Sequence, residues 1–307
     1  MALDISVIIL TYNEEIHIRR CIERILPVTG KVFVVDSYST DSTVAIAKEL
    51  GAEVYQNKWE NNHAIQFNWA LTNLPIKTEW VLRLDADEYL TEELIAELHS
   101  KLPNLNNDFT GIVLPRRHVF MNRHLKHGIG KVLLLRIFKY EFGKCESRWM
   151  DEHIILSTGR QVIFENEFVD HNLNQLGRWT AKHNGYAIRE AIDLLDAELG
   201  LFPTDETTKE VMSKQAFEKR KKKLKYTRAP LFWRSFAYFL YRYFFRLGFT
   251  EGRIGFLWHF LQGWWYRTLV DAKIFEIKLA CGNDKEKIID YIKTNYYIDC
   301  RKIKTNV

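Results

Sequence analysis

The chain has 307 residues, of which 47% are hydrophobic and 27% charged, with 15 glycines and 6 prolines. This composition is that of a globular protein of about two domains, and it excludes a disordered chain, a collagen-like repeat and a disulfide-rich miniprotein. The 44 basic and 39 acidic residues leave a net charge of +5, which does not indicate a nucleic-acid binder at the level of the whole chain.

The first hundred residues alternate apolar runs with helical patterns, which predicts parallel strands joined by crossover helices. Strands are expected over 6–10, 32–35, 53–55 and 80–84, and helices over 15–26, 42–50 and 63–74. From 111 to about 170 the pattern becomes shorter and strand-like, with strands expected at 131–138 and 160–164. We therefore expect an α/β domain over residues 1–175, with the later strands extending the same sheet.

Residues 176–307 are expected to form a helical region, with helices over 179–198 and 205–225. Between 214 and 228 there are eight basic residues and one acidic residue, and the segment 231–266 then holds 16 of the chain's 42 aromatic residues. The uncharged runs 235–241 and 254–266 are shorter than the roughly 18 apolar residues of a spanning helix. A transmembrane segment is therefore not expected.

The aromatic segment also carries Arg234, Arg242 and Arg246 within one broad sector of a helix, opposite a face rich in Phe, Tyr and Leu. This pattern is typical of a helix at the bilayer interface, with its basic residues toward anionic lipid. The preceding lysine run would add attraction of about 1 kcal/mol per charge. We expect peripheral, monotopic attachment to an anionic membrane surface; a helical subdomain packed on the sheet is the alternative.

Four cysteines, Cys21, Cys145, Cys281 and Cys300, are far apart and form no CxxC pair. This spacing argues against a structural zinc site and a secreted disulfide framework. The N-terminal residues lack a basic region followed by a long apolar core, so no signal peptide is expected. A reducing cytosolic location fits both observations.

Polar motifs follow three of the expected strands: TYNEE at 11–15, VVDSYSTDST at 34–43 and RLDADE at 83–88. Ligands of open α/β sheets bind at the carboxyl ends of the strands, so these motifs mark a candidate binding edge. Asp85 and Asp87 alternate across Ala86, and an extended strand end would point both carboxylates the same way. Such a pair is a hard-oxygen seat for Mg²⁺ or Mn²⁺.

The ordered set TYNEE, VVDSYSTDST, LDADE and WMDEH resembles the family 2 glycosyltransferases, which have the nucleotide-sugar-binding GT-A fold. The resemblance covers roughly residues 4–184, and within the family the chain is most similar to bacterial enzymes that extend lipopolysaccharide core, O-antigen or other carrier-linked glycans. It implies a nucleotide-sugar donor, UDP-linked by expectation, a lipid-linked or lipopolysaccharide acceptor, and a position on the cytoplasmic face of the inner or plasma membrane. No nucleic-acid partner is expected.

The resemblance also assigns roles at the donor site. Asp85 would approach the ribose, and Asp87 would hold the metal on the diphosphate. Asn68 is a weaker candidate for the donor site, because the arginine that many relatives place beside it is missing here. The residues implied to line the nucleoside pocket are Thr11, Asn13, Glu14 and Asp36.

Cleavage of a sugar–diphosphate bond with inversion also needs a base for the acceptor's proton. Glu152 is the expected catalytic base, with Asp151 as its neighbour or substitute, and Trp149 would stack on a sugar face. In a strand only one of the two carboxylates would point into the site. His171 is a candidate third metal ligand, and His153 is its rival.

Two other functions remain open at this point. A nucleotidyltransferase would share the architecture, but it needs a glycine-rich basic phosphate loop where this chain has the acidic TYNEE. A non-catalytic nucleotide or nucleic-acid binder would use the basic run with its neighbouring aromatics. Arg116, Arg117 and His118 would contact an anionic acceptor or nucleotide, or else form a solvated strand edge.

Overall fold

A computed structural model describes residues 2–60, 62–146, 152–202 and 226–300. The first part of the chain alternates strands and helices: β1 Ile5–Thr11, α1 Glu15–Glu23, β2 Val32–Asp36, α2 Thr43–Glu49, β3 Glu53–Gln56, α3 His63–Asn73 and β4 Trp80–Asp85. These elements confirm the expected α/β order. The helix expected over 15–26 ends three residues earlier, at Glu23.

The next elements are mostly strands: β5 Glu88–Leu90, α4 Glu92–Lys101, β6 Phe109–Phe120, β7 Arg123–His124, β8 Val132–Lys139, β9 Gly143–Cys145, β10 Ile154–Leu156, β11 Arg160–Ile163 and β12 Phe168–His171. The strands expected over 131–138 and 160–164 are confirmed as β8 and β11. A short 3₁₀ turn, Leu102–Asn104, follows α4.

Most of the described strands form one mixed sheet in the order β3-β2-β1-β4-β8-β6-β12-β5. β1 pairs in parallel with β2 and β4, so Thr11 lies beside Asp36, and Leu10 beside Asp85. The carboxyl ends of these three strands therefore share one edge of the sheet. β8 runs antiparallel between β4 and β6, and β12 pairs with both β6 and β5.

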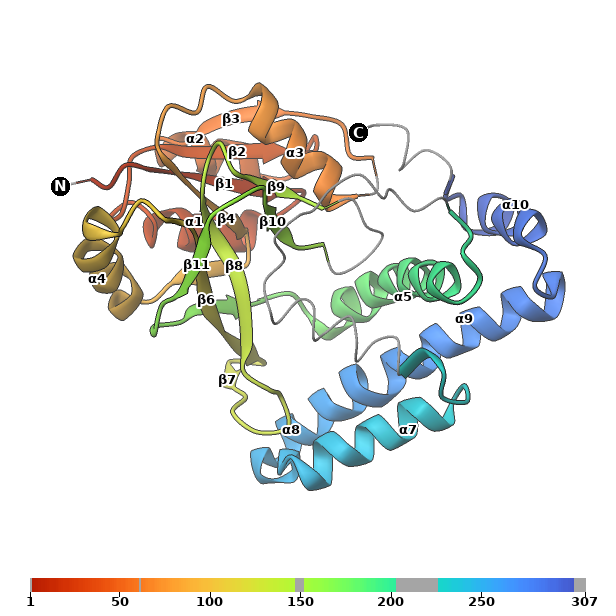
Figure 1. Ribbon diagram of the computed structural model, residues 1–307. Coiled ribbons are helices and arrows are strands. Elements are labelled where there is room, and N and C mark those ends of the chain that lie inside the picture. The colour runs from red at the N-terminus through yellow and green to blue at the C-terminus, as the bar shows by residue number, and fades with distance from the viewer. Residues whose placement is uncertain (1, 61, 147–151, 203–225, 301–307) are drawn as a thin grey trace.

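The two faces of the sheet are covered by different helices (Figure 1). Along β1, Val7 and Ile9 belong to the core beneath α1, α2 and α4, whereas Ile8 belongs to the core beneath α3 and the β9–β10 hairpin. This alternation follows from the two-residue period of a strand, and burial on both faces explains why β1 is nearly all apolar. Each fully buried Ile or Val contributes about 1.5–3 kcal/mol to folding.

The C-terminal part is helical: α5 Leu176–Leu199, α7 Trp233–Leu240, α8 Gly252–Trp258, α9 Tyr266–Cys281 and α10 Lys285–Tyr296. The π-helical turn η2 Tyr241–Phe245 extends α7, and a second one, η4 His259–Trp265, extends α8. A 3₁₀ turn, η3 Gly248–Glu251, lies between η2 and α8. α5 lies between the sheet and α9 (Figure 1), and α5, α9 and α10 share a core that includes Ala191, Leu195 and Ile277. The helix expected over 205–225 and most of the basic run lie outside the described residues.

Two of the three arginines expected to face outward are buried, whereas the third, Arg246, is exposed. Arg234 is only 5% exposed, and its Nε donates to Asp271 of α9 at 2.8 Å. Arg242 is 7% exposed, and its Nε donates to the Gly128 carbonyl at 3.1 Å. The expectation that these two side chains face lipid is therefore wrong, because an internal carboxylate and a loop carbonyl bind them. No helix among the described residues is long and apolar enough to span a bilayer.

Candidate functional site

The ends of β1 and β2 are tied together by their polar side chains. Thr11 Oγ1 donates to Asp36 Oδ1 at 2.9 Å, and Asp36 Oδ2 accepts the Ser39 amide at 2.8 Å. Asp36 has no exposed surface and Thr11 is buried. In this conformation the two residues shape the edge of the sheet and the loop after β2, and they present no exposed carboxylate to a ligand.

Asn13 and Glu14 continue this edge. Asn13 has a φ of 55°, a left-handed conformation that asparagine tolerates better than most residues, and its Oδ1 accepts the Thr40 amide at 2.8 Å. The Glu14 carboxylate contacts His17 Nδ1 at 2.6 Å and keeps 19% of its side chain exposed. Both residues are partly accessible, unlike Thr11 and Asp36.

Asp85 ends β4 and is held by arginine side chains from the sheet. Arg136 of β8 lies 2.5 Å from Glu88 and 3.6 Å from Asp85. Burial raises the pKa of Asp85, but the nearby Arg136 and Arg83 guanidinium groups outweigh it and lower the pKa to about 2. Asp85 is therefore a carboxylate at neutral pH, with 41% of its side chain exposed.

Asp87 lies in the turn between β4 and β5. Its Oδ2 accepts Asn172 Nδ2 at 2.9 Å, and its carbonyl accepts the His171 amide at 3.1 Å. Its pKa is raised, first by burial and then by the negative charges of Asp170, Asp85 and Glu14. Burial and these carboxylates outweigh the opposing charge of Lys182, and a bound cation would stabilise the ionised form of Asp87.

Asp85 and Asp87 supply a donor set that fits Mg²⁺ or Mn²⁺ bound to a substrate diphosphate. Mg²⁺ in such sites takes one or two protein carboxylates, and substrate phosphates and water complete its shell. Within the described parts of the chain, no three His, Cys, Asp or Glu side chains are grouped as a complete metal site. The pair thus suits a cation that arrives with its nucleotide better than a permanently held one.

The ring of His171 has partners other than a metal in this structure. Its Nδ1 lies 3.1 Å from Arg20 Nη1, and its Nε2 lies 2.9 Å from Asn122 Oδ1. Burial and Arg20 both lower its pKa. Both ring nitrogens have protein partners in this structure, and metal ligation by His171 stays a prediction. The neighbouring Asn172 contacts Asp87 instead.

Asn68 also hydrogen-bonds within the protein in this structure. Its Nδ2 donates to the Cys145 carbonyl and its Oδ1 accepts the Cys145 amide, each at 2.8 Å. Both ends of its amide are used in this structure, so the contact of Asn68 with a nucleotide stays a prediction. Asn68 attaches α3 to β9, the first strand of the hairpin whose loop carries the expected base.

The loop between β9 and β10 is only partly described. Trp149 and Asp151 lie outside the described residues, whereas Glu152 is described and partly buried. Burial lowers the pKa of Arg83 on β4. The interactions of Arg83 with Cys145, Asp85 and Glu152 outweigh this effect, so the pKa is raised. Glu152 and Asp85 therefore act on the same buried guanidinium, although 67 positions separate them in the sequence.

One face of α5 supplies cations that the sequence analysis did not identify. Arg178 Nη2 donates to the Asn13 carbonyl at 3.0 Å. One turn later lies Lys182. Desolvation by the surrounding protein lowers its pKa, but Tyr186, Asp87 and Glu14 outweigh this effect and raise the pKa well above the usual value. The recurrence of basic and aromatic residues at 178, 182, 186 and 189, a helical spacing, is the signal that could have found this face.

The basic residues at the end of β6 have carboxylate partners within the protein. Arg116 and His118 lie 3.2 and 3.3 Å from Asp170, and Arg117 lies 2.9 Å from Glu167. The positive charge of Arg116 and Arg117 is therefore already paired with carboxylates of the protein.

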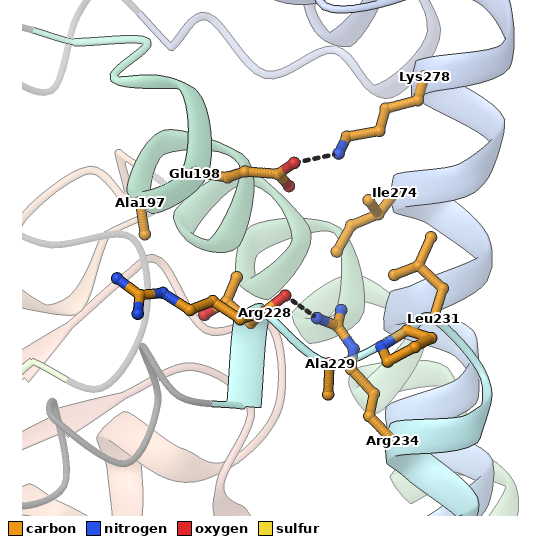
Figure 2. Close-up of a pocket in the computed structure, with 10 residues that line it drawn as sticks. Ala197, Glu198, Arg228, Ala229, Leu231, Arg234, Ile274 and Lys278 are labelled. Atoms are coloured by element: carbon orange, nitrogen blue, oxygen red, sulfur yellow. Dashed lines mark hydrogen bonds and ion pairs between the residues drawn. The ribbon is translucent and has the colours of Figure 1, made fainter.

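A separate pocket of about 530 Å³ lies between the end of α5, α9 and the segment 227–234 (Figure 2). Glu198 and Lys278 form an ion pair of 2.6 Å across it, and Arg234 Nη1 donates to the Thr227 carbonyl at 3.1 Å. No residue lining this pocket belongs to the strand-end carboxylates, so it is not part of the candidate donor site.

The mixed sheet and the helices on its two faces form a Rossmann-like α/β fold of the GT-A class, and the paired aspartates lie at the carboxyl edge of this sheet. The same fold occurs in the solved structure of the mannosyltransferase PcManGT from Pyrobaculum calidifontis, in complex with GDP-Man and Mn²⁺. The two chains are 15% identical, with a TM-score of 0.50 over 90% of this chain and 88% of that one.

Residues 6–167 match the family model of glycosyl transferase family 2, and the chain belongs to this family. An uncharacterized glycosyltransferase of Rickettsia typhi is 41% identical over 104 residues, which are 34% of this chain and 35% of that one. The SPbeta prophage-derived glycosyltransferase SunS of Bacillus subtilis is 32% identical over 87 residues, 28% of this chain and 20% of that one. These matches span about a third or less of each relative's length.

Proposed function

We propose that this protein transfers a sugar from a nucleotide-sugar donor, UDP-linked in our assignment, to a hydroxyl group of a lipid-linked or lipopolysaccharide-type acceptor. The observation that carries the proposal is the partly exposed pair Asp85 and Asp87 at the carboxyl edge of β4, with Glu152 acting on the same arginine as Asp85. Membership in glycosyltransferase family 2 supports the class of reaction.

The reaction is a single displacement with inversion. The acceptor oxygen attacks the anomeric carbon, the bond from that carbon to the diphosphate breaks, and the electron pair of this bond passes to the diphosphate oxygen. Glu152, or Asp151 in its place, accepts the acceptor's proton, which typically contributes about 10²–10⁴-fold to the rate.

Asp85 and Asp87 would hold Mg²⁺ or Mn²⁺ against the donor's diphosphate. When bound, this cation supplies charge neutralisation worth several kcal/mol at the departing oxygen. PcManGT, which has the same fold, was solved with GDP-Man and Mn²⁺. Asn13 and Glu14 are the accessible members of the nucleoside edge, whereas Thr11 and Asp36 hold the edge in shape. Tyr12 and Tyr38, both more than half exposed beside them, offer aromatic faces to a base.

A panel of UDP- and GDP-sugars tests this assignment directly. With Mn²⁺ or Mg²⁺ present, we expect at least one donor to release its nucleoside diphosphate, and a lipid-linked acceptor to accelerate the release. Excess EDTA should abolish it. If no donor is cleaved or transferred with either metal and either class of acceptor, the proposed function is wrong.

An aromatic surface on the C-terminal helices supports the proposed acceptor class. Trp233, Tyr241 and Phe244 project on one side of the helical stretch formed by α7 and η2, and all three are exposed, Trp233 by 72%. Phe245, at 79%, borders this side. Exposed aromatic residues in this number suit the headgroup level of a bilayer, where a lipid-linked acceptor would be met.

Vesicle flotation checks the membrane assignment. The full chain is expected to float with vesicles of phosphatidylglycerol and phosphatidylethanolamine, and the double variant Trp233→Ser, Phe245→Ser to lose most of this binding. Ile163→Ser removes an apolar side chain of β11 that is 56% exposed and serves as the control. Equal flotation of the double variant and the control would contradict a membrane role for this surface.

A further inference from the structure

We propose that Lys182 of α5 binds the diphosphate of the donor and stabilises the negative charge that its β-phosphate gains as the sugar leaves. This inference rests on the proposed function and adds a residue of the chain to it. Three observations carry it: the anchoring of α5 at the sheet edge, the acidic neighbours of Lys182, and the orientation of its helix face.

The start of α5 is attached to both halves of the candidate donor site. Asn172, just before the helix, donates to Asp87, and the Leu173 amide donates to His17 Nε2 at 2.8 Å. Arg178 then reaches the Asn13 carbonyl. The chain from 172 to 178 therefore runs from the turn after β4 to the turn after β1, and the first turns of α5 are held against this edge.

Lys182 comes one helical turn after Arg178, on the same face. It interacts electrostatically with Glu14, Asp85 and Asp87, and also with His63 at the start of α3. Lys182 is surrounded by enough protein to be partly desolvated, but it keeps access to solvent. Among the described residues its side chain interacts directly with Tyr186 and forms no ion pair. Its recorded contact is with Tyr186 on its own helix, with the ammonium 5.7 Å from the ring centre.

A lysine placed in this way has one carboxylate neighbour in the nucleoside turn and two in the pair proposed to hold the cation. If Asp85 and Asp87 held a cation, their charge would be neutralised, and Lys182 would then be available to attract the diphosphate of the donor. The arginines on the sheet side already have partners within the protein, Arg136 at Asp85 and Glu88 and Arg83 at the Cys145 sulfur, although the Nε of each has no hydrogen-bond partner. Lys182 therefore supplies the positive charge on the open side of the site.

Nucleotide binding by the full chain, measured by calorimetry, tests the role of Lys182. Wild-type protein should bind UDP or GDP more tightly than UMP or GMP, with and without Mg²⁺. Lys182→Met should weaken diphosphate binding by about 10- to 100-fold, since a hydrogen bond to a charged group is lost, and monophosphate binding by less than about 3-fold. Lys182→Arg, which keeps the charge, should retain most of the affinity.

Lys278→Met is the matched control, because Lys278 pairs with Glu198 of α5 outside the site. It should leave all four affinities unchanged. An unchanged diphosphate affinity in Lys182→Met would overturn the proposal, and so would equal losses for mono- and diphosphates, which indicate a structural role. A Lys182→Arg variant that binds like Lys182→Met also overturns the proposal. Thermal unfolding of each variant shows whether a loss of binding is caused by misfolding. Wild-type protein that binds none of the four nucleotides would instead refute the proposed function.

Discussion

Replacing Asp87 with asparagine is expected to reduce sugar transfer by about 10³-fold or more, with the protein still folded. The substitution keeps an oxygen that can accept from Asn172, but it removes the charge that we propose holds the cation on the diphosphate. Several kcal/mol of charge stabilisation at the departing oxygen correspond to a rate loss of this size. Steady-state release of nucleoside diphosphate, with Mn²⁺ varied, measures the effect.

Asp85→Asn should also reduce transfer, and it should in addition disturb the bridge from Arg136 to Asp85 and Glu88. Glu198→Gln removes an exposed carboxylate from α5 and is the control, with transfer expected within about 2-fold of wild type because exposed ion pairs contribute little. Undiminished turnover after complete chelation, together with full activity of an Asp85→Ala, Asp87→Ala double variant, would refute the metal assignment.

The second large effect is expected in the β9–β10 loop. Glu152→Gln should lower the turnover number by about 10²–10⁴-fold and leave nucleotide affinity nearly unchanged, because a general base acts on the acceptor and not on the donor. Asp151→Asn, measured separately, should have the smaller effect. Pre-steady-state transfer and nucleotide calorimetry on the same preparations separate chemistry from binding.

Glu146→Gln is the matched control for this loop. Its side chain accepts the His153 amide at 3.1 Å, and glutamine keeps an oxygen for that contact, so transfer should persist. Near-normal transfer by both Glu152→Gln and Asp151→Asn, in folded protein, would show that neither is the base. A product with retained anomeric configuration, or a covalent glycosyl–enzyme intermediate, would contradict the single displacement.

The fold of the first hundred residues could be predicted because its signals are local. The β-branched runs and the helical periods between them lie within windows of a few residues, and the predicted strands agree with β1 to β4 within one residue at each end. The pairing of β12 with β5 and β6 has no such signal, since it joins segments about 50 to 80 positions apart. The division of the chain at residue 175 stays a prediction.

The sequence by itself determined the class of fold and the place of Asp85 and Asp87, since a polar pair that ends an apolar parallel strand must lie at the binding edge. Only the tertiary structure decided which candidate side chains have hydrogen-bond partners within the protein. Asn68 is used by Cys145, His171 by Arg20 and Asn122, and Arg234 by Asp271. It also decided that the first turns of α5 lie against that edge, where Arg178 donates to the Asn13 carbonyl. These outcomes depend on contacts between residues 37 to 165 positions apart, which no local pattern of residue types encodes.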